Sequence, residues 1–172
     1  MWIIITFKYH KKYYISILLV EVIVSKDALK FFQAYINEMI SVGGENLPKV
    51  ISTKSGEKLA KLYKDRGMNR DVESALKQIY AALGARTRIK KIDENTYDIQ
   101  NKYRHKFCPI GGSFKPSRAP LFQNHICKPY TFGFLSAVFP QFKFEVDIKN
   151  CIVFSNHNIC HYILKLEQRK SL

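Results

Sequence analysis

Hydrophobic residues follow a helical period in the middle of the chain. Between positions 55 and 84 they recur every three or four residues, which predicts a helix at residues 55–65 and a second one between an N-cap at Asn69 and a stop at Gly84. Residues 28–40 predict an earlier helix. The pair Gly43-Gly44 and the following Pro48 predict a break after it.

Strand-like alternation dominates the rest of the chain. Residues 87–91 and 96–100 alternate around a polar turn and predict a hairpin, and residues 142–148 and 160–166 predict two further strands around a turn at 156–158. A helix is predicted at 131–139, where Pro140 stops it, after a loop-rich stretch from 108 to 120. Residues 2–7 and 13–24 are rich in Ile, Val and Tyr and predict two strands.

The length of 172 residues and the 47% hydrophobic content suit one globular domain with a sizeable core. We place a boundary at the glycine-rich break. Residues 1–45 then form an N-terminal β/α segment, either an extension or a dimerisation element, residues 46–168 the main domain, and residues 169–172 a tail.

The chain is basic, with a formal net charge of +14. Such a charge favours anionic partners, so a nucleic-acid-associated transcriptional regulator is one functional hypothesis. However, the basic residues are scattered and we find no DNA-reading motif. The apolar stretch at 15–24 is interrupted by Glu21 and is shorter than the roughly 20 residues that span a bilayer. It also has no signal-peptide cleavage pattern, so we expect a cytoplasmic protein with reduced thiols.

All four cysteines, Cys108, Cys127, Cys151 and Cys160, lie in the last part of the chain. One late-assembled site for a soft metal ion would explain this, and zinc takes thiolate sulfur tetrahedrally. Cys151 and Cys160 flank the turn predicted at 156–158, and Cys127 shortly precedes a predicted helix, where the macrodipole favours a thiolate. The alternative is four buried, unpaired thiols that act as small hydrophobic side chains.

No catalytic constellation stands out. The five histidines are not spaced as in a metalloprotease helix, and no nucleophile elbow, phosphate loop or dinucleotide fingerprint is present. We therefore favour a binding role over an enzymatic one.

The segment from Cys127 to Glu167 carries a recognisable pattern. A cysteine leads a helix with Tyr130, Gly133 and Phe134, a hydrophobic strand ends at a second cysteine, and a third cysteine begins the last strand. This pattern resembles the vinyl-4-reductase-type domain, also called the hydrocarbon-binding domain, and the resemblance extends over residues 46–168. The family includes the ligand-sensing domains of phenol-responsive transcription activators, and related folds occur in TRAPP subunits of membrane trafficking and in haem-based nitric-oxide sensors.

The resemblance implies an α/β domain of the α+β kind, in which an antiparallel sheet packs against helices. It also implies a structural zinc ion, a small hydrophobic or aromatic ligand and a homodimer. We expect Cys127, Cys151 and Cys160 to bind the zinc. The fourth ligand is open: Cys108 is the first choice, and Glu145, Asp147, His125 and His157 are the alternatives. The ligand-pocket candidates are Tyr130, Phe134, Phe139 and Phe144.

Overall fold

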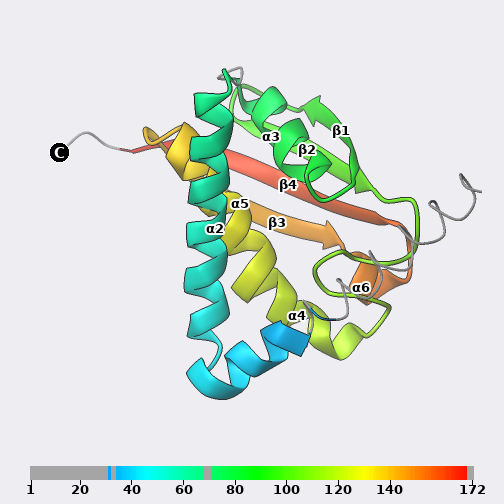
Figure 1. The fold of residues 1–172 in the computed structure, drawn as a ribbon. Helices are drawn as coiled ribbons and strands as arrows, with labels where there is room; N and C mark the ends of the chain where they lie inside the picture. The colour runs from blue at the N-terminus through cyan, green and yellow to red at the C-terminus, as the bar shows by residue number, and fades with distance from the viewer. Residues whose placement is uncertain (1–30, 32–33, 68–70, 170–172) are drawn as a thin grey trace, which may run out of the picture.

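The computed structural model describes residues 31, 34–67 and 71–169, which form one antiparallel sheet with helices packed on one of its faces (Figure 1). After a helix at residues 34–43, the elements in chain order are α2 (Asn46–Asp65), α3 (Val72–Ala81), β1 (Arg86–Lys91), β2 (Thr96–Lys102), the 3-10 turn η1 (Pro116–Arg118), α4 (Ala119–Phe122), the π-helical turn η2 (Gln123–Cys127), α5 (Lys128–Val138), β3 (Phe142–Asn150), α6 (Ile152–Ser155) and β4 (Ile159–Gln168). The predicted fold class is confirmed.

The four strands run in the order β1-β2-β4-β3, and each neighbouring pair is antiparallel. Exposed and less exposed residues alternate along β3, so one face of the sheet meets solvent and the other meets the helices. Ile99 of β2 lies opposite Tyr162 of β4, and both are buried on the helix-covered face.

The hydrophobic interior has two parts. The larger part lies between the sheet and the helices α2, α3 and α5, with Leu76, Phe134 and Leu164 among its fully buried residues. The second part includes Ile36 of helix 34–43, the loop around Ile110, the α4–η2 segment and α6. The candidate site lies where these two parts meet.

The helix α2 begins nine residues before the predicted start, because Pro48 does not interrupt it. Pro48 occupies the first turn, where a backbone N–H has no intrahelical acceptor and its loss costs nothing. The break seen in the sequence is therefore confined to the turn at residues 44–45.

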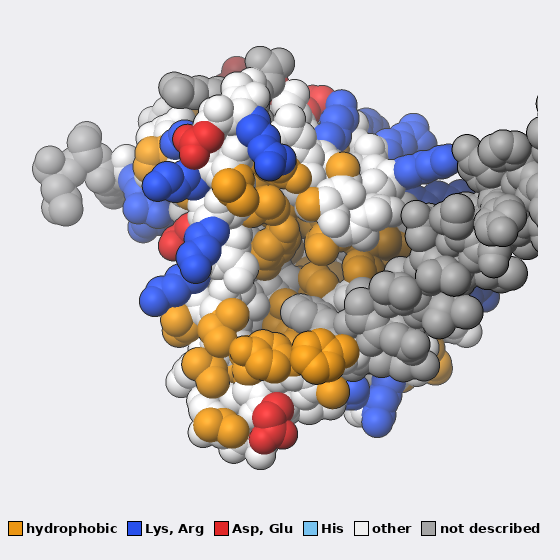
Figure 2. Space-filling model, in the orientation of Figure 1, with side chains coloured by type: hydrophobic (Ala, Val, Ile, Leu, Met, Phe, Trp, Pro, Cys, Tyr) orange, Lys and Arg blue, Asp and Glu red, His pale blue; other side chains and the backbone are white. Residues whose placement is uncertain are grey.

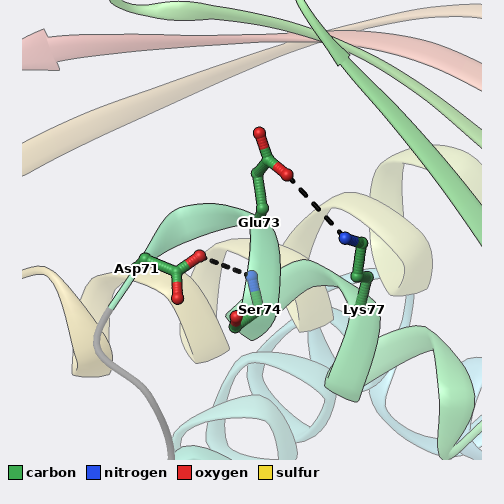
Figure 3. A network of polar contacts seen from close by, with 4 residues as sticks. All are labelled: Asp71, Glu73, Ser74 and Lys77. Carbon is green, nitrogen blue, oxygen red and sulfur yellow. Dashed lines mark hydrogen bonds and ion pairs between the residues drawn. The ribbon is translucent and has the colours of Figure 1, made fainter.

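The N-cap predicted at Asn69 lies outside the described residues, and the helix α3 is instead capped by Asp71. The Asp71 carboxylate accepts a hydrogen bond of 2.8 Å from the backbone N–H of Ser74 (Figure 3). One turn further on, Lys77 lies 3.8 Å from Glu73 on the exposed surface of the helix. The helix ends at Ala81, shortly before Gly84, whose φ of 75° needs a residue without a side chain.

The region from 116 to 138 differs most from the prediction. The helix α5 begins at Lys128, and α4 and η2 precede it without a break. Cys127 therefore lies inside a continuous helical segment, with φ of −62° and ψ of −54°. The expectation that Cys127 precedes a helix N-terminus is wrong.

The four strands agree with the prediction within a few residues: β1, β2, β3 and β4 all form, and each is longer than predicted by one to three residues. The short helix α6 was not predicted. The strands predicted at 2–7 and 13–24 lie outside the described residues, as does the start of the helix predicted at 28–40. Among the described helices, none combines the length and the apolar character that crossing a bilayer requires.

Candidate functional site

All four cysteines line a single cavity of about 70 Å³, although their positions in the sequence span more than fifty residues. The cavity lies between the inner face of the sheet and the α4–η2–α5 segment. Its other lining residues are Tyr80, Leu83, Asn101, Tyr103, Ile110, Gln123, Lys128, Tyr130, Thr131, Val146, Ile148, Asn150 and Tyr162. We refer to it as the thiol cavity.

Cys108 is held by a tight turn in the loop after β2. Its backbone exchanges two hydrogen bonds of 2.9 Å with Gly112, whose φ is 82°. The N–H of Gly111 also donates to the Cys108 sulfur at 3.2 Å. A side chain at position 111 would collide with Val153, since a Cβ atom there would lie 2.5 Å from it. The glycine pair therefore allows the loop to bring this sulfur to the cavity.

Cys151 and Cys160 lie at the two ends of the connection between β3 and β4. Cys151 is the N-cap of α6, and its N–H donates to the Asn150 side chain, which in turn donates to the carbonyl of Ile159. Asn156 ends α6 in the left-handed conformation, with φ of 54°. The short helix thus turns the chain so that the two thiols are hydrogen-bonded to each other.

The four thiols differ in how easily they lose a proton. The hydrogen bond from Cys160 lowers the pKa of Cys151, and the N–H of Val153 and the side chain of Gln123 act in the same direction. The same hydrogen bond raises the pKa of Cys160. Burial raises the pKa of Cys127 and of Cys108, although the Gly111 N–H opposes it at Cys108. The hydrogen-bonded pair of Cys151 and Cys160, rather than Cys127, therefore holds the thiol that most readily becomes a thiolate.

Of the five candidates for the fourth zinc ligand, only Cys108 lines the thiol cavity. Glu145 and Asp147 project from the solvent face of β3, and His157 is exposed. His125 contacts Glu45, with 3.0 Å between Nε2 and the carboxylate. His161, next to Cys160, points to the opposite face of the sheet and contacts Asp98 at 3.0 Å.

The chemistry of the donor set fits zinc, because four thiols face one cavity and one of them favours the thiolate. Within residues 31, 34–67 and 71–169, however, no three His, Cys, Asp or Glu side chains are grouped closely enough to hold a metal ion. The four sulfur atoms share a cavity without forming a finished coordination shell.

A chain of hydroxyl and amide groups forms another wall of the cavity. Tyr162 donates to the hydroxyl of Tyr80 at 2.7 Å, and the Tyr80 hydroxyl lies 2.9 Å from Thr131 Oγ1. Asn101 contacts the Tyr162 hydroxyl and accepts a hydrogen bond of 2.8 Å from Thr87. Burial raises the pKa of Tyr80 and of Tyr162 well above the usual value, so both remain protonated hydrogen-bonding groups.

This polar wall was not predicted from the sequence. The sequence feature that could have indicated it is the position of Asn101. This residue follows Tyr97 and Ile99 at a spacing of two, which puts all three on the same face of a strand. The predicted strand stopped at residue 100, so the polar residue on the buried face was missed.

Of the four ligand-pocket candidates, Tyr130 lines the thiol cavity. Phe134 and Phe139 are buried in the larger part of the core, and Phe144 packs against it. These three phenylalanines line neither the thiol cavity nor the second cavity described next.

A second cavity of about 230 Å³ lies between helix 34–43, α2 and the η2–α5 segment. Its walls are mostly apolar, and we call it the apolar cavity. It is lined by Tyr35, Ile36, Met39, Ile51, Ser52, Ser55, Leu83, Ile110, Ile126 and Tyr130. Figure 2 shows hydrophobic side chains in the hollowed centre of this face and over its lower part, with Lys and Arg around the periphery.

Comparison with known proteins finds similarity in structure but not in sequence. No protein-family model matches the chain, and no curated protein matches it. A trafficking protein particle complex subunit 3 from Naegleria fowleri, covalently bound to palmitic acid, superposes with a TM-score of 0.59 at 13% identity. The match covers 86% of this chain and 99% of that one.

Two further solved structures share the fold. The phenol-responsive sensory domain of the transcription activator PoxR, solved with phenol, has a TM-score of 0.53 at 16% identity over 80% of this chain and 73% of that one. The H-NOX domain SO2144 from Shewanella oneidensis, in its Fe(II)CO ligation state, has a TM-score of 0.50 at 12% identity over 83% and 75%. At these identities the comparisons establish a common fold.

Proposed function

We propose that this protein is a non-catalytic binding or sensor domain for a small, largely apolar molecule, and that it belongs to the vinyl-4-reductase-type family. The observation that carries the proposal is a pair of adjoining cavities, one between the sheet and the helices and the other among the helices. One is lined by apolar side chains and the other adds a small number of fixed hydroxyl and thiol groups. Ligand sites commonly combine apolar walls with a few polar groups that orient the bound molecule.

Two of the structural relatives support this proposal through their ligands, since one was solved with phenol and another with palmitic acid. Both ligands are mainly hydrocarbon with one polar end. The apolar cavity would suit the hydrocarbon, and the hydroxyl groups of Ser52 and Ser55 on its wall would suit the polar end.

Native mass spectrometry of gently purified protein tests the proposal, because it reports a retained ligand, bound zinc and the oligomeric state together. A complementary test adds phenol, octanol or a fatty acid to the protein and measures thermal unfolding. A ligand present at 100 times its Kd should stabilise the folded state by about 2.7 kcal/mol. Absence of both a retained ligand and any stabilisation by these three probes would refute the proposal.

We further propose that Cys108, Cys127, Cys151 and Cys160 hold one zinc ion. Zinc would link the loop after β2, the η2 turn and the β3–β4 connection through four sulfur bonds. With four protein ligands no coordination position is left for a reacting water molecule, which agrees with a structural role. Cys151, with its lowered pKa, is the thiol best prepared to bind first.

Elemental analysis of reduced protein tests the zinc proposal, and about one zinc per chain is expected. Cys151→Ser should lose the metal and several kcal/mol of stability, since structural zinc binding contributes directly to folding. The matched controls are variants that should keep both the zinc ion and the stability: Glu145→Gln, Asp147→Asn and His157→Gln. Metal-free protein with unchanged stability in Cys151→Ser would show that the thiols are ordinary buried residues.

A homodimer in a reducing compartment such as the cytoplasm completes the proposal. The four cysteines are free thiols, as such a compartment would keep them. Phe31, Tyr35, Val42 and Val50 are at least half exposed, and they supply apolar surface for a second copy. Light scattering should give the mass of a dimer, and Val42→Lys should shift it toward the monomer.

A nucleic-acid-associated role is the second candidate, and the sheet provides an observation in its favour. Arg86, Arg88 and Lys90 lie on the solvent face of β1, and Lys102 lies directly opposite Arg86. Two like charges facing each other across strands destabilise a sheet unless an anion lies between them. Electrophoretic mobility with duplex DNA at low and moderate salt tests this role, because phosphate-driven binding weakens steeply with salt.

A further inference from the structure

The thiol cavity and the apolar cavity have three residues in common, Leu83, Ile110 and Tyr130. These side chains therefore form the partition between the two spaces. Tyr130 has the largest side chain of the three and is the one that carries a polar group. Removing it would join the cavities.

The sizes of the cavities determine which of them can hold a ligand. A dry engineered cavity of about 150 Å³ accepts benzene. The thiol cavity, at about 70 Å³, is smaller than that, whereas the apolar cavity, at about 230 Å³, is larger. A hydrocarbon group with the bulk of one ring or a short chain fits the apolar cavity. A longer molecule would have to occupy both cavities.

The backbone at Tyr130 is fixed, so only its side chain can alter the partition. Gly56 of α2 packs against Tyr130, and a Cβ atom at position 56 would lie 2.2 Å from the Tyr130 carbonyl oxygen. Likewise, a Cβ atom at position 133 would lie 2.2 Å from the Thr53 carbonyl oxygen. Two backbones in direct contact cannot shift apart without losing this packing. The backbone of Tyr130 thus stands at a defined place beside both cavities.

We propose that Tyr130 is the residue that determines ligand size in this site, because its ring closes the apolar cavity toward the thiol cavity. This inference rests on the proposed binding function and adds a selection rule to it. Ligands with one polar end should bind more tightly with each added methylene until the apolar cavity is full. Beyond that length the ring blocks the chain, and affinity should stop rising or fall.

A homologous series of primary alcohols, from butanol to dodecanol, provides the test, with binding measured by calorimetry on the full-length protein. For the unmodified protein we expect about a fourfold gain in affinity per methylene up to a limiting length. Tyr130→Ala should move that limit to alcohols longer by several carbons. Tyr130→Phe retains the ring and should leave the limit unchanged, whereas Tyr130→Trp should shorten it.

Tyr130→Leu serves if the alanine variant does not fold, since it removes the ring and keeps an apolar side chain. If the unmodified protein and both ring-removing variants share the same limit, the partition role is overturned while the binding function stands. If the unmodified protein binds none of the alcohols, the binding function itself fails.

Discussion

Gly133 of α5 lies so close to Thr53 of α2 that a Cβ atom at position 133 would stand 2.2 Å from the Thr53 carbonyl oxygen. Glycine is unfavourable inside a helix by about 1 kcal/mol relative to alanine. Its presence here is explained by the contact between the two helix backbones, which also brings Tyr130 to the cavities.

Gly133→Ala should therefore destabilise the protein although it improves helix propensity. The added methyl group meets backbone atoms that cannot rotate away, and overpacking of this kind costs about 1–3 kcal/mol. Denaturant unfolding measures the loss. Ser136→Ala on the same helix is the control and should change stability by much less. Equal stability of Gly133→Ala and the unmodified protein would show that α2 and α5 are not in contact here.

The hydroxyl groups of Tyr80 and Tyr162 should stabilise each other. Tyr162→Phe removes one donor and should cost about 1 kcal/mol. Tyr80→Phe should cost more, because it leaves the hydroxyls of Tyr162 and Thr131 without the partner they share. A double-mutant cycle of urea unfolding measures the coupling. Strictly additive losses would mean that the two hydroxyls do not interact.

Asp71 should make the stability of α3 depend on pH. The backbone N–H of Ser74 lowers the pKa of the Asp71 carboxyl below its ordinary 3.8. A lowered folded-state pKa means that the carboxylate stabilises the protein above about pH 4 and that this contribution disappears as pH falls through the lowered value. Asp71→Ala should cost about 1 kcal/mol at neutral pH.

Asp71→Asn separates the cap from the charge in the same experiment. Its side-chain oxygen can still accept the hydrogen bond, so most of the stability should remain at neutral pH. The part of the stability that depends on the Asp71 charge should vanish in this variant. Its free energy of unfolding should therefore change less between pH 5 and about pH 3 than that of the unmodified protein. Identical profiles would show that the charge of Asp71 does not contribute to stability.

The buried tyrosines should limit stability at alkaline pH. Burial raises the pKa of Tyr130 to about 12, and it raises those of Tyr80 and Tyr162 further, from an ordinary 10.0. Because the unfolded state releases these protons first, stability should fall as pH rises above 10. Tyrosinate absorbance should accordingly appear in two steps, the second together with unfolding. Tyr162→Phe should weaken this alkaline dependence, and a single titration step without unfolding would contradict the assignment.

Local pattern was sufficient to predict the four strands and the helices α2, α3 and α5, but not the short helical segments η1, α4, η2 and α6. Alternation placed Tyr97 and Ile99 on one face of β2, because the period of a strand assigns each residue to a side regardless of what covers it. The structure adds Tyr162 of β4 to the same buried face. The same reasoning misjudged Pro48 and Cys127. Whether a proline begins a helix, and whether two helical segments join, depends on neighbours that the local pattern does not contain.

The sequence by itself determined that sheet, helices and four late cysteines would be present, because period and composition are local properties. The tertiary structure alone decided that the four cysteines line one cavity, that Asn101 joins a buried hydroxyl chain, and that Tyr130 borders two cavities. These relationships depend on the packing of α2 against α5 and on the turns that join the strands. Residues distant along the chain become neighbours only when that packing is complete.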